Sequence, residues 1–492
     1  MENLDTSKKH MFSDTIIYLI AKLIEGVVGI FIVSRYTYYF SEIAYGRYIT
    51  LNTTIQIVAA FSMLWLSQSM YRFFKEYEEK NKLTQFYTTS FFIWLGVNLI
   101  VSSLALTLLI VVNANSTLPL NFEVYIWAII AFIAYNTQTT LTTTLASSRK
   151  TKFNLILSMC SAFGKFFLVI LLVYVYEANV VVIFITNATI DTFVSVLAFL
   201  RLKIYKYIKI RSLSQRVFKR FIVYGTPFLG SILTTTLINN SDRYIISVED
   251  VAIYVTNYSL VSTLYTMLNT GISRGSVPTI YNVYTKGNKD EAYSLVSQLV
   301  KYYLILIVPL NFGIALISKE LSTLLFAPSY KEAHFVMVFV SIALTFSFLT
   351  ECSNKVFELK GETKYIFRYS LIGGLLNFVL NLLFIPKYGY VVACFTTVIG
   401  YLTYFLLSKR KSMEYNKWSL GKSFYIKVFG ISTLMFIFVS ILKTFLGSSL
   451  ISTIFYVVVA IVFYIVFAYY TGLIKEEVNT VLNALRKKGE QK

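Results

Sequence analysis

The stretch RLKIYKYIKIRSLSQRVFKR at residues 201–220 decides the fold, because it separates two long apolar parts of the chain. It holds eight lysines and arginines and is the most basic connection in the sequence. Six apolar runs of membrane-spanning length precede it and eight follow it. A segment with this charge stays in water, whereas apolar runs of about 20 residues cross a bilayer as helices. The pattern predicts two groups of membrane helices joined by a basic linker.

The composition agrees with this prediction. Of the 492 residues, 56% are hydrophobic and only 14% are charged, against about 25% charged in an ordinary soluble domain. So few charges cannot cover the surface of a water-soluble globule of this size. We expect an all-α membrane protein with about fourteen spans, near 12–34, 45–67, 85–112, 122–147, 153–175, 178–200, 220–242, 250–275, 293–316, 333–352, 364–385, 388–408, 424–443 and 449–472.

The lysines and arginines predict the orientation of these spans. With the amino terminus in the cytoplasm, the inside segments hold 33 of these residues and the outside loops hold 6. Because short basic loops stay in the cytoplasm, both termini are expected there. The same asymmetry accounts for the net charge of +20 without a nucleic-acid partner. Basic loops of this kind contact anionic headgroups, so membrane lipids are the expected partner.

The basic linker also predicts the domain organisation. We expect five parts: an N-terminal six-helix bundle (1–200), a basic cytoplasmic linker (201–219), a C-terminal six-helix bundle (220–410), two additional helices (411–472) and a cytoplasmic tail (473–492). Paired groups of helices that enclose a central site are frequent in transporters.

A few charged residues lie deep within the predicted spans. Lys22 and Lys165 are the deepest cations, and a charge at that depth costs about 2.5–3.5 kcal/mol on insertion scales unless it faces protein or water. Lys22 shares a helical stripe with Asp14 and Glu25, and Lys165 ends a polar stripe on its own span. Two interpretations remain open: buried ion pairs, Lys22 with Glu25 and Lys165 with Asp191, or a hydrated cationic cavity for an anionic substrate.

The sequence contains no catalytic motif. It has no phosphate-binding loop, no nucleophile elbow and no zinc-protease motif, and its loops are too short to fold as catalytic domains. Three scattered cysteines and two histidines exclude a disulfide framework and a histidine metal site within one chain. We therefore expect a protein that is not an enzyme and that holds no cofactor or metal.

Three segments carry a family resemblance. They are DTIIYLIAKLIEGVVGIFIVSRYTYYFSEIAYGRY (14–48) followed by QSMYRFFKEY (68–77), then YGTPFLGSILTTTLINNSDRYI (224–245), and NFVLNLLFIPKYGYVVACFTTVIGY (377–401). The motif residues within them are Tyr45, Gly46, Arg72, Phe73, Phe74, Tyr224, Gly225, Pro227, Asp242, Arg243, Asn377, Asn381, Ile385, Pro386 and Gly389. The chain thereby resembles the polysaccharide repeat-unit (O-antigen or teichoic type) flippases of the multidrug/oligosaccharidyl-lipid/polysaccharide exporter superfamily, over about residues 1–410.

The resemblance implies a fold and a function. The fold would be a V-shaped pair of six-helix bundles in a bacterial plasma membrane that works by alternating access. The substrate would be an undecaprenyl-pyrophosphate-linked oligosaccharide, carried from the inner to the outer leaflet. A multidrug exporter and a peptidoglycan precursor flippase of the same superfamily are the alternatives. A polysaccharide polymerase is a candidate contact.

The resemblance also implies roles for individual residues. Cationic side chains that line the central cavity of such flippases correspond to Lys22, Arg47 and Arg274 here, and Lys165 would be an addition of this protein. The candidates for coupling to a proton or sodium gradient are Asp14, Glu25, Asp191 and Asp242.

Overall fold

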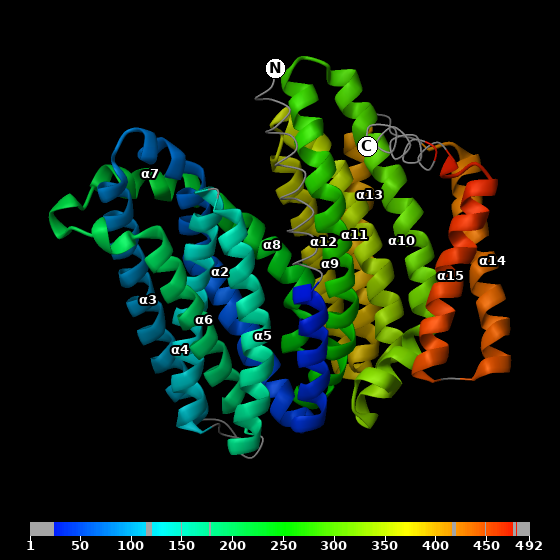
Figure 1. The fold of residues 1–492 in the computed structure, drawn as a ribbon, viewed down its shortest axis with the longest axis horizontal. Helices are drawn as coiled ribbons and strands as arrows, with labels where there is room; N and C mark the ends of the chain where they lie inside the picture. Colours follow the sequence, from blue (N-terminus) through cyan, green and yellow to red (C-terminus); the bar gives the residue numbers. More distant parts are fainter. Residues whose placement is uncertain are drawn as a thin grey trace, which may run out of the picture. The chain divides into compact units, whose positions relative to one another are not determined.

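The computed structural model describes residues 24–114, 121–148, 150–176, 179–415, 420–447, 449–475 and 479, and every regular element in these residues is helical. Residues 24–39 form a first helix. The elements that follow are α2 (Glu42–Glu79), α3 (Leu83–Ala114), α4 (Phe122–Ser147), α5 (Thr151–Val175), α6 (Val181–Leu202), η1 (Ile204–Lys206), η2 (Ile210–Ser212), α7 (Gln215–Gly225), α8 (Phe228–Asn240), η3 (Asp242–Tyr244), α9 (Val248–Thr285), α10 (Lys289–Leu325), η4 (Pro328–His334), α11 (Phe335–Lys360), α12 (Lys364–Tyr388), α13 (Tyr390–Ser412), α14 (Lys422–Leu446) and α15 (Leu450–Tyr470) (Figure 1).

Most of these helices have the length and the composition of membrane spans. Eleven described helices are long and apolar enough to cross a bilayer, and α7 and α8 add a twelfth if the bent pair counts as one span. The first predicted span, 12–34, lies partly outside the described residues, and the eighth, 250–275, falls on α9, which is not among the eleven. The prediction of an all-helical, multi-pass membrane protein is confirmed. The number fourteen and the cytoplasmic position of both termini stay predictions.

The chain forms two compact units that divide between Val255 and Thr256. This division comes later than the predicted boundary at residue 220, because α7 and α8 pack on α2 in the first unit. The grouping of the spans as six plus six, and their V-shaped arrangement, stay predictions.

In the first unit, the linker after α6 is fastened to α3. The Thr88 hydroxyl donates to the Tyr207 carbonyl and accepts from the Lys209 N–H, each at 3.0 Å. The neighbouring hydroxyl of Thr89 accepts from the Ser214 N–H at 3.1 Å. These bonds satisfy backbone groups that a short irregular segment cannot satisfy by itself. The predicted basic linker is therefore a fixed part of this unit.

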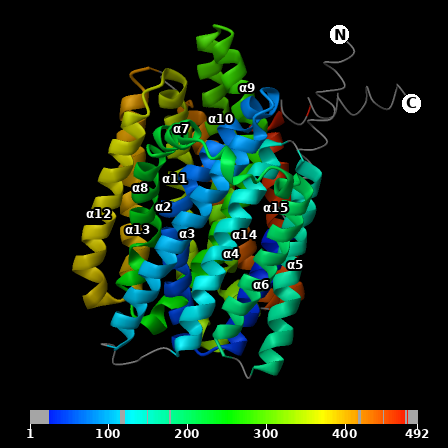
Figure 2. The same cartoon turned by 90° about the vertical axis from the view of Figure 1, so that its left-hand side faces the viewer.

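The following helix, α7, lies against the ends of α2 and α3 (Figures 1 and 2). The Arg220 guanidinium forms two hydrogen bonds with the Glu76 carboxylate, at 2.6 and 2.9 Å, and lies 4.1 Å from the centre of the Phe73 ring. Next, α8 departs from α7 at an angle of 41° after a break of two residues that contains Pro227. Proline lacks an N–H and cannot continue the helical hydrogen bonding, which accounts for the bend.

Two glycines of the family-like motifs lie where backbones meet in the first unit. A Cβ atom on Gly46 would lie 1.7 Å from the Val248 carbonyl oxygen, and one on Gly225 would lie 2.6 Å from that of Trp65. Any other side chain would therefore push the neighbouring backbone away. Packing between helices thus accounts for both motif glycines.

In the second unit, α10 joins the core helices to the last pair, α14 and α15 (Figure 1). Lys443 of α14 pairs with Glu320 of α10 at 2.7 Å and donates to the Leu316 carbonyl at 2.5 Å. From α15, the Tyr464 hydroxyl donates to the Ile305 carbonyl at 2.9 Å. These polar bonds fix the additional pair on the bundle in a setting where lipid competes with apolar contacts between helices.

Candidate functional site

Two groups of polar side chains and one cavity are the candidate functional features of the described residues. The first group belongs to the first unit, whereas the second group and the cavity belong to the second unit.

The first group contains an ion pair between α5 and α6. Lys165 Nζ lies 2.7 Å from Asp191 Oδ1, and the two side chains are 24% and 2% exposed. The sequence left two interpretations open, buried ion pairs or a cationic cavity, and this contact is one of the predicted ion pairs. Because the carboxylate is buried and its lysine is only partly exposed, Lys165 is neutralised where it lies. Binding of an anion by Lys165 would require the pair to open, and this role stays a prediction.

Other polar residues of the first unit also meet across helices. On α4, the Gln138 amide donates to the Ser161 hydroxyl of α5 at 3.3 Å. On α6, the Asn187 amide donates to the Tyr48 hydroxyl of α2 at 3.5 Å. Helices of the first unit therefore turn polar residues toward one another.

Asp242 is held in a structural role at the turn between α8 and α9. It is 2% exposed. One carboxylate oxygen accepts from the Tyr254 hydroxyl at 2.7 Å, and the other accepts from the Arg243 N–H at 2.9 Å. This geometry is sufficient to order the turn, and coupling to an ion gradient by Asp242 stays a prediction.

The remaining predicted site residues are only partly described. Asp14 and Lys22 lie outside the described residues, and so does the side chain of Arg274, which belongs to α9. Glu25 and Arg47 are partly buried near the starts of the first helix and α2. The Lys22–Glu25 pair, the cationic cavity and the roles of these residues stay predictions.

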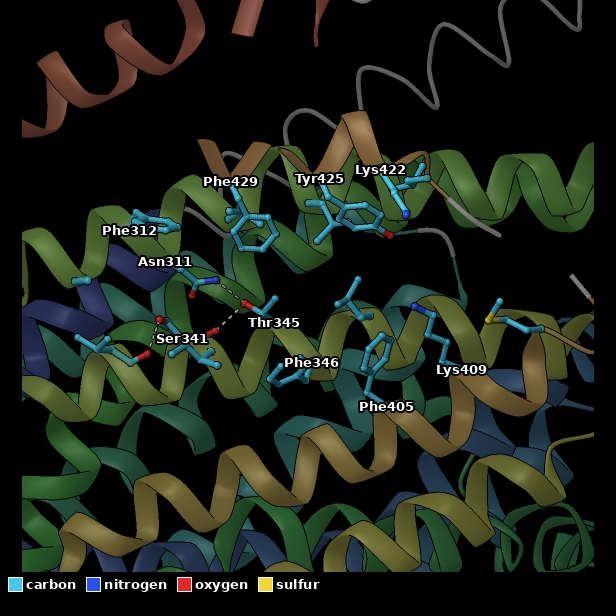
Figure 3. A pocket seen from close by; sticks show the side chains of 18 residues that line it. Asn311, Phe312, Ser341, Thr345, Phe346, Phe405, Lys409, Lys422, Tyr425 and Phe429 are labelled. Carbon is cyan, nitrogen blue, oxygen red and sulfur yellow. Dashed lines mark hydrogen bonds between the residues drawn. The ribbon is translucent and has the colours of Figure 1, made fainter. Parts of the chain in front are cut away.

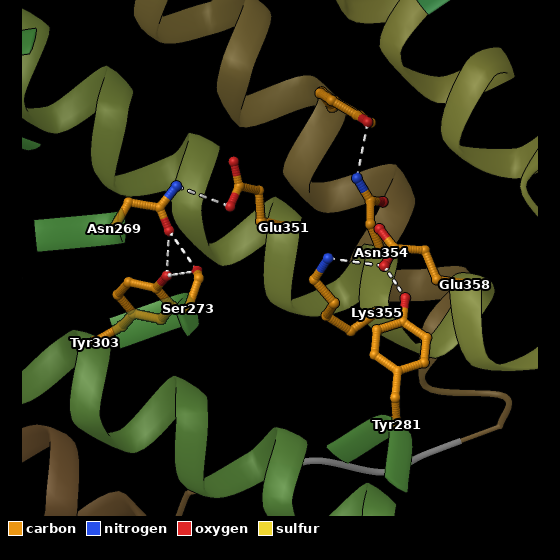
Figure 4. A network of polar contacts seen from close by, with 9 residues as sticks. Asn269, Ser273, Tyr281, Tyr303, Glu351, Asn354, Lys355 and Glu358 are labelled. Atoms are coloured by element: carbon orange, nitrogen blue, oxygen red, sulfur yellow. Dashed lines mark hydrogen bonds and ion pairs between the residues drawn. The ribbon is translucent and has the colours of Figure 1, made fainter. Parts of the chain in front are cut away.

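The second polar group joins α9, α10 and α11 (Figure 4). The Asn269 amide nitrogen donates to the Glu351 carboxylate at 3.0 Å. The Asn269 carbonyl oxygen accepts from the Ser273 hydroxyl at 2.9 Å and from the Tyr303 hydroxyl. This group, Asn269, Ser273, Tyr303 and Glu351, is called the amide–carboxylate network below.

Farther along α11, a different carboxylate has a cationic partner. Glu358 accepts from Lys355 at 2.7 Å and from the Tyr281 hydroxyl at 2.5 Å (Figure 4). On the same helix, the Asn354 amide donates to the Tyr404 hydroxyl of α13 at 2.9 Å. Lys355 is thus engaged by Glu358.

Sequence reasoning missed the amide–carboxylate network. Glu351 stands at the predicted end of a span, where a carboxylate is expected to reach water. It was therefore not predicted to be a site residue. The available signal was the spacing of Asn269 and Ser273, four residues apart and therefore on one face of α9. Which helix that face meets cannot be obtained from spacing.

The cavity lies between α10, α11, α13 and α14 and has a volume of about 740 Å³ (Figure 3). Most of its wall is aliphatic or aromatic and includes Phe312, Ile342, Leu349 and Phe429, whereas Lys409 and Lys422 lie together toward one end. At a distance from the lysines, the Asn311 amide donates to the Thr345 hydroxyl at 2.8 Å. A cavity of this kind fits a ligand with a long apolar part and an anionic group.

No group of three or more histidine, cysteine, aspartate or glutamate side chains suited to a metal ion occurs in the described residues. The chemistry available at the sites above is ion pairing, hydrogen bonding, proton exchange and accommodation of an apolar chain.

Taken together, the described residues form a multi-pass helical membrane protein. No family model matches the sequence. A search of curated proteins gives a match to an uncharacterized membrane protein of Methanocaldococcus jannaschii, 27% identical over 124 residues. The matched segment is 25% of this chain and spans only 24% of that relative.

Solved structures match over most of the chain. A structure of the lipid II flippase MurJ in an inward closed conformation superimposes with a TM-score of 0.70, at 14% identity, over 94% of this chain and 100% of the flippase. A transporter of the MOP superfamily from Pyrococcus furiosus gives a TM-score of 0.61 at 12% identity, over 83% of this chain and 95% of that one. An inward-facing multidrug resistance MATE family transporter gives a TM-score of 0.61 at 12% identity, over 82% of this chain and 100% of that transporter. These structural neighbours are transporters and flippases rather than enzymes, and they share the fold of this chain.

Proposed function

We propose that this chain is a flippase that carries an undecaprenyl-pyrophosphate-linked oligosaccharide, the repeat unit of a cell-surface polysaccharide, from the inner to the outer leaflet of a bacterial plasma membrane. It works by alternating access and is coupled to an ion gradient. The lipid tail stays in an apolar environment while the pyrophosphate and the sugars pass through the protein.

The cavity between α10, α11, α13 and α14 is the observation that carries this proposal. Its volume of about 740 Å³ lies within the usual range of ligand pockets, about 300–1,000 Å³. An aliphatic and aromatic wall suits an isoprenoid chain, and Lys409 and Lys422 at one end suit a phosphate. A lipid-linked glycan has both features.

The extent of the structural likeness supports a flippase over a drug exporter. The superposition on the lipid II flippase includes more of this chain than the superpositions on the multidrug transporters. The likeness to the lipid II flippase makes a peptidoglycan precursor flippase the second candidate, because the named substrate of that neighbour is also a lipid.

Four cations are the proposed contacts for the pyrophosphate. Lys22, Arg47 and Arg274 are the cations that the family resemblance places in a central cavity, which is not the cavity between α10, α11, α13 and α14. Lys165 joins them once its pair with Asp191 opens. Cations that face a hydrated interior offset the cost of removing water from the phosphates.

Complementation of a deletion strain tests the proposal. Loss of the chain is expected to abolish surface polysaccharide, to accumulate the lipid-linked oligosaccharide and to leave peptidoglycan synthesis intact. Accumulation of lipid II with cell lysis would assign the peptidoglycan precursor instead, and normal polysaccharide would refute both.

Two pairs of variants sharpen this experiment. Ile342→Trp fills the cavity and is expected to fail, whereas Ile399→Trp, on an exposed position of α13, is expected to complement. Lys22→Glu is expected to fail at normal protein level, whereas Lys82→Glu, exposed in the turn between α2 and α3, is expected to complement. Complementation by Ile342→Trp would remove the cavity from the mechanism, and complementation by Lys22→Glu would remove that cation.

A further inference from the structure

Glu351 lies in the carboxyl-terminal half of α11, a helix that is long and apolar enough to cross a membrane. This helix has 26 residues and ends at Lys360, nine residues after Glu351. At 1.5 Å per residue, Glu351 is about 14 Å from that end of the helix, and residues on both sides of it, including Leu349, Thr350 and Cys352, are buried. The side chain itself is partly exposed. A carboxylate at this depth is costly unless a partner or a proton neutralises it.

The hydrogen bonds around Asn269 determine which atom faces Glu351. The hydroxyls of Ser273 and Tyr303 both donate to the Asn269 carbonyl oxygen. The amide nitrogen is thereby turned toward the carboxylate and donates to Glu351 Oε2. The network therefore supplies the carboxylate with one neutral hydrogen-bond donor and no charge.

No lysine or arginine pairs with Glu351 in the described part of the chain. Lys355 follows it by one helical turn on α11, but the lysine ammonium lies 2.7 Å from Glu358 instead. From the neighbouring helices, the titratable groups that interact with Glu351 are tyrosines, Tyr303 of α10 and Tyr401 and Tyr404 of α13. Lys355, Cys352 and Glu358 are the remaining such groups, all on α11. None of these groups brings a positive charge except Lys355.

We propose that Glu351 is a proton-binding site, and that its protonation in the amide–carboxylate network couples transport to a proton gradient. A proton from water adds to the carboxylate oxygen that Asn269 does not occupy, and no bond is broken in the protein. The neutral acid removes the charge from the membrane interior, whereas release of the proton restores it. The coupling part rests on the transport function proposed above.

A proton suits this site better than a metal cation. Hard metal ions are bound in proteins through several oxygen ligands. Here the amide presents its nitrogen to the carboxylate, and its oxygen already accepts two hydroxyl hydrogens. The amide oxygen is thus already engaged, and the free carboxylate oxygen is sufficient for a proton.

Infrared difference spectroscopy of the full-length protein in lipid nanodiscs tests proton binding directly. Lowering the pH is expected to produce the carbonyl band of a buried, protonated carboxylic acid. The band is expected to be lost in Glu351→Gln and retained in Glu351→Asp. It is also expected to be retained in Glu358→Gln, the matched control two turns along α11. A band that persists in Glu351→Gln, or one that moves only when sodium chloride is titrated at constant pH, would overturn the proposal.

A second variant keeps the test decisive if Glu351→Gln does not fold. Asn269→Leu removes the amide donor, so the carbonyl band of the acid is expected to shift to higher frequency. An unshifted band in that variant would show that the acid detected is not Glu351.

Coupling is tested by transport in cells. Glu351→Gln is expected to abolish the dependence of polysaccharide export on the transmembrane pH gradient, and Glu358→Gln is expected to retain it. If the infrared band titrates while deletion of the chain leaves surface polysaccharide normal, the proton site stands and the proposed substrate is wrong. If the band is absent while deletion abolishes polysaccharide, the flippase stands and this proton site is wrong. Gradient dependence that persists in Glu351→Gln would overturn the coupling role.

Discussion

Asp191 and Glu351 are two carboxylates on membrane helices with opposite surroundings. Asp191 of α6 is 2% exposed and has the Lys165 ammonium at 2.7 Å. Glu351 of α11 is partly exposed and has the Asn269 amide at 3.0 Å. An ammonium holds a carboxylate in its charged form, whereas an amide hydrogen-bonds to it without balancing its charge. The comparison teaches that the partner, more than the depth, decides whether a membrane carboxylate is available to exchange a proton.

The largest effect is expected from breaking the pair in the first unit. Lys165→Met leaves Asp191 buried and unpaired, and removal of one partner of a buried pair costs about 3 kcal/mol. The free energy of unfolding in mixed detergent micelles is expected to fall by about that amount. The double variant Lys165→Met/Asp191→Asn is expected to recover at least half of the loss.

Lys427→Met is the control for this pair. Lys427 is a helix-end lysine whose exposed ammonium donates to the Thr471 carbonyl at 2.7 Å, so its removal is expected to cost less than about 1 kcal/mol. Equal losses in Lys165→Met and Lys427→Met, or no recovery in the double variant, would mean that the pair does not stabilise the fold.

An intermediate effect is expected from the amide of the second unit. Asn269→Leu deprives Glu351 of its donor and deprives the hydroxyls of Ser273 and Tyr303 of their shared acceptor. Loss of these bonds is expected to lower the free energy of unfolding by about 2 kcal/mol. Asn282→Leu, exposed on the same helix, is expected to be close to neutral in the same titration. A neutral Asn269→Leu would show that the network is not formed.

The smallest effect is expected where a carboxylate is replaced by an amide of the same shape. In Glu351→Gln the new side-chain oxygen still accepts from Asn269, so the free energy of unfolding is expected to change by less than about 1 kcal/mol. The same change in the first unit, Asp191→Asn, leaves Lys165 without its counter-charge and is expected to cost about 2 kcal/mol or more. Similar losses in the two variants would remove the distinction between the two carboxylates.

The sequence predicted the Lys165–Asp191 contact as one of two alternatives, and the reason is physical. Few charges occur in apolar runs, so a deep lysine has few acids on neighbouring spans with which to pair. Short connections make consecutive helices antiparallel neighbours, which brings α5 and α6 together. Glu351 was not predicted, because its partners Asn269 and Tyr303 are neutral, and neutral polar residues are frequent in these helices.

The linker at 201–220 also shows what can and cannot be predicted from the sequence. Its charge predicts a connection between spans. The linker is attached to α3 through Thr88 and Thr89, and α7 is attached to α2 through Arg220 and Glu76. These contacts join residues more than 100 positions apart. The compact boundary at Val255 follows from those contacts rather than from composition.

By itself, the sequence determined that this protein crosses a membrane repeatedly as helices, because long apolar runs with few internal charges have no other stable arrangement in a bilayer. Local spacing also determined which residues share a helical face. Only the tertiary structure decided which faces meet. It turned the Asn269 amide toward Glu351, engaged Lys355 with Glu358, and left a cavity between α10, α11, α13 and α14. The rotation of each helix about its axis is set by packing with its neighbours, and no local pattern encodes it.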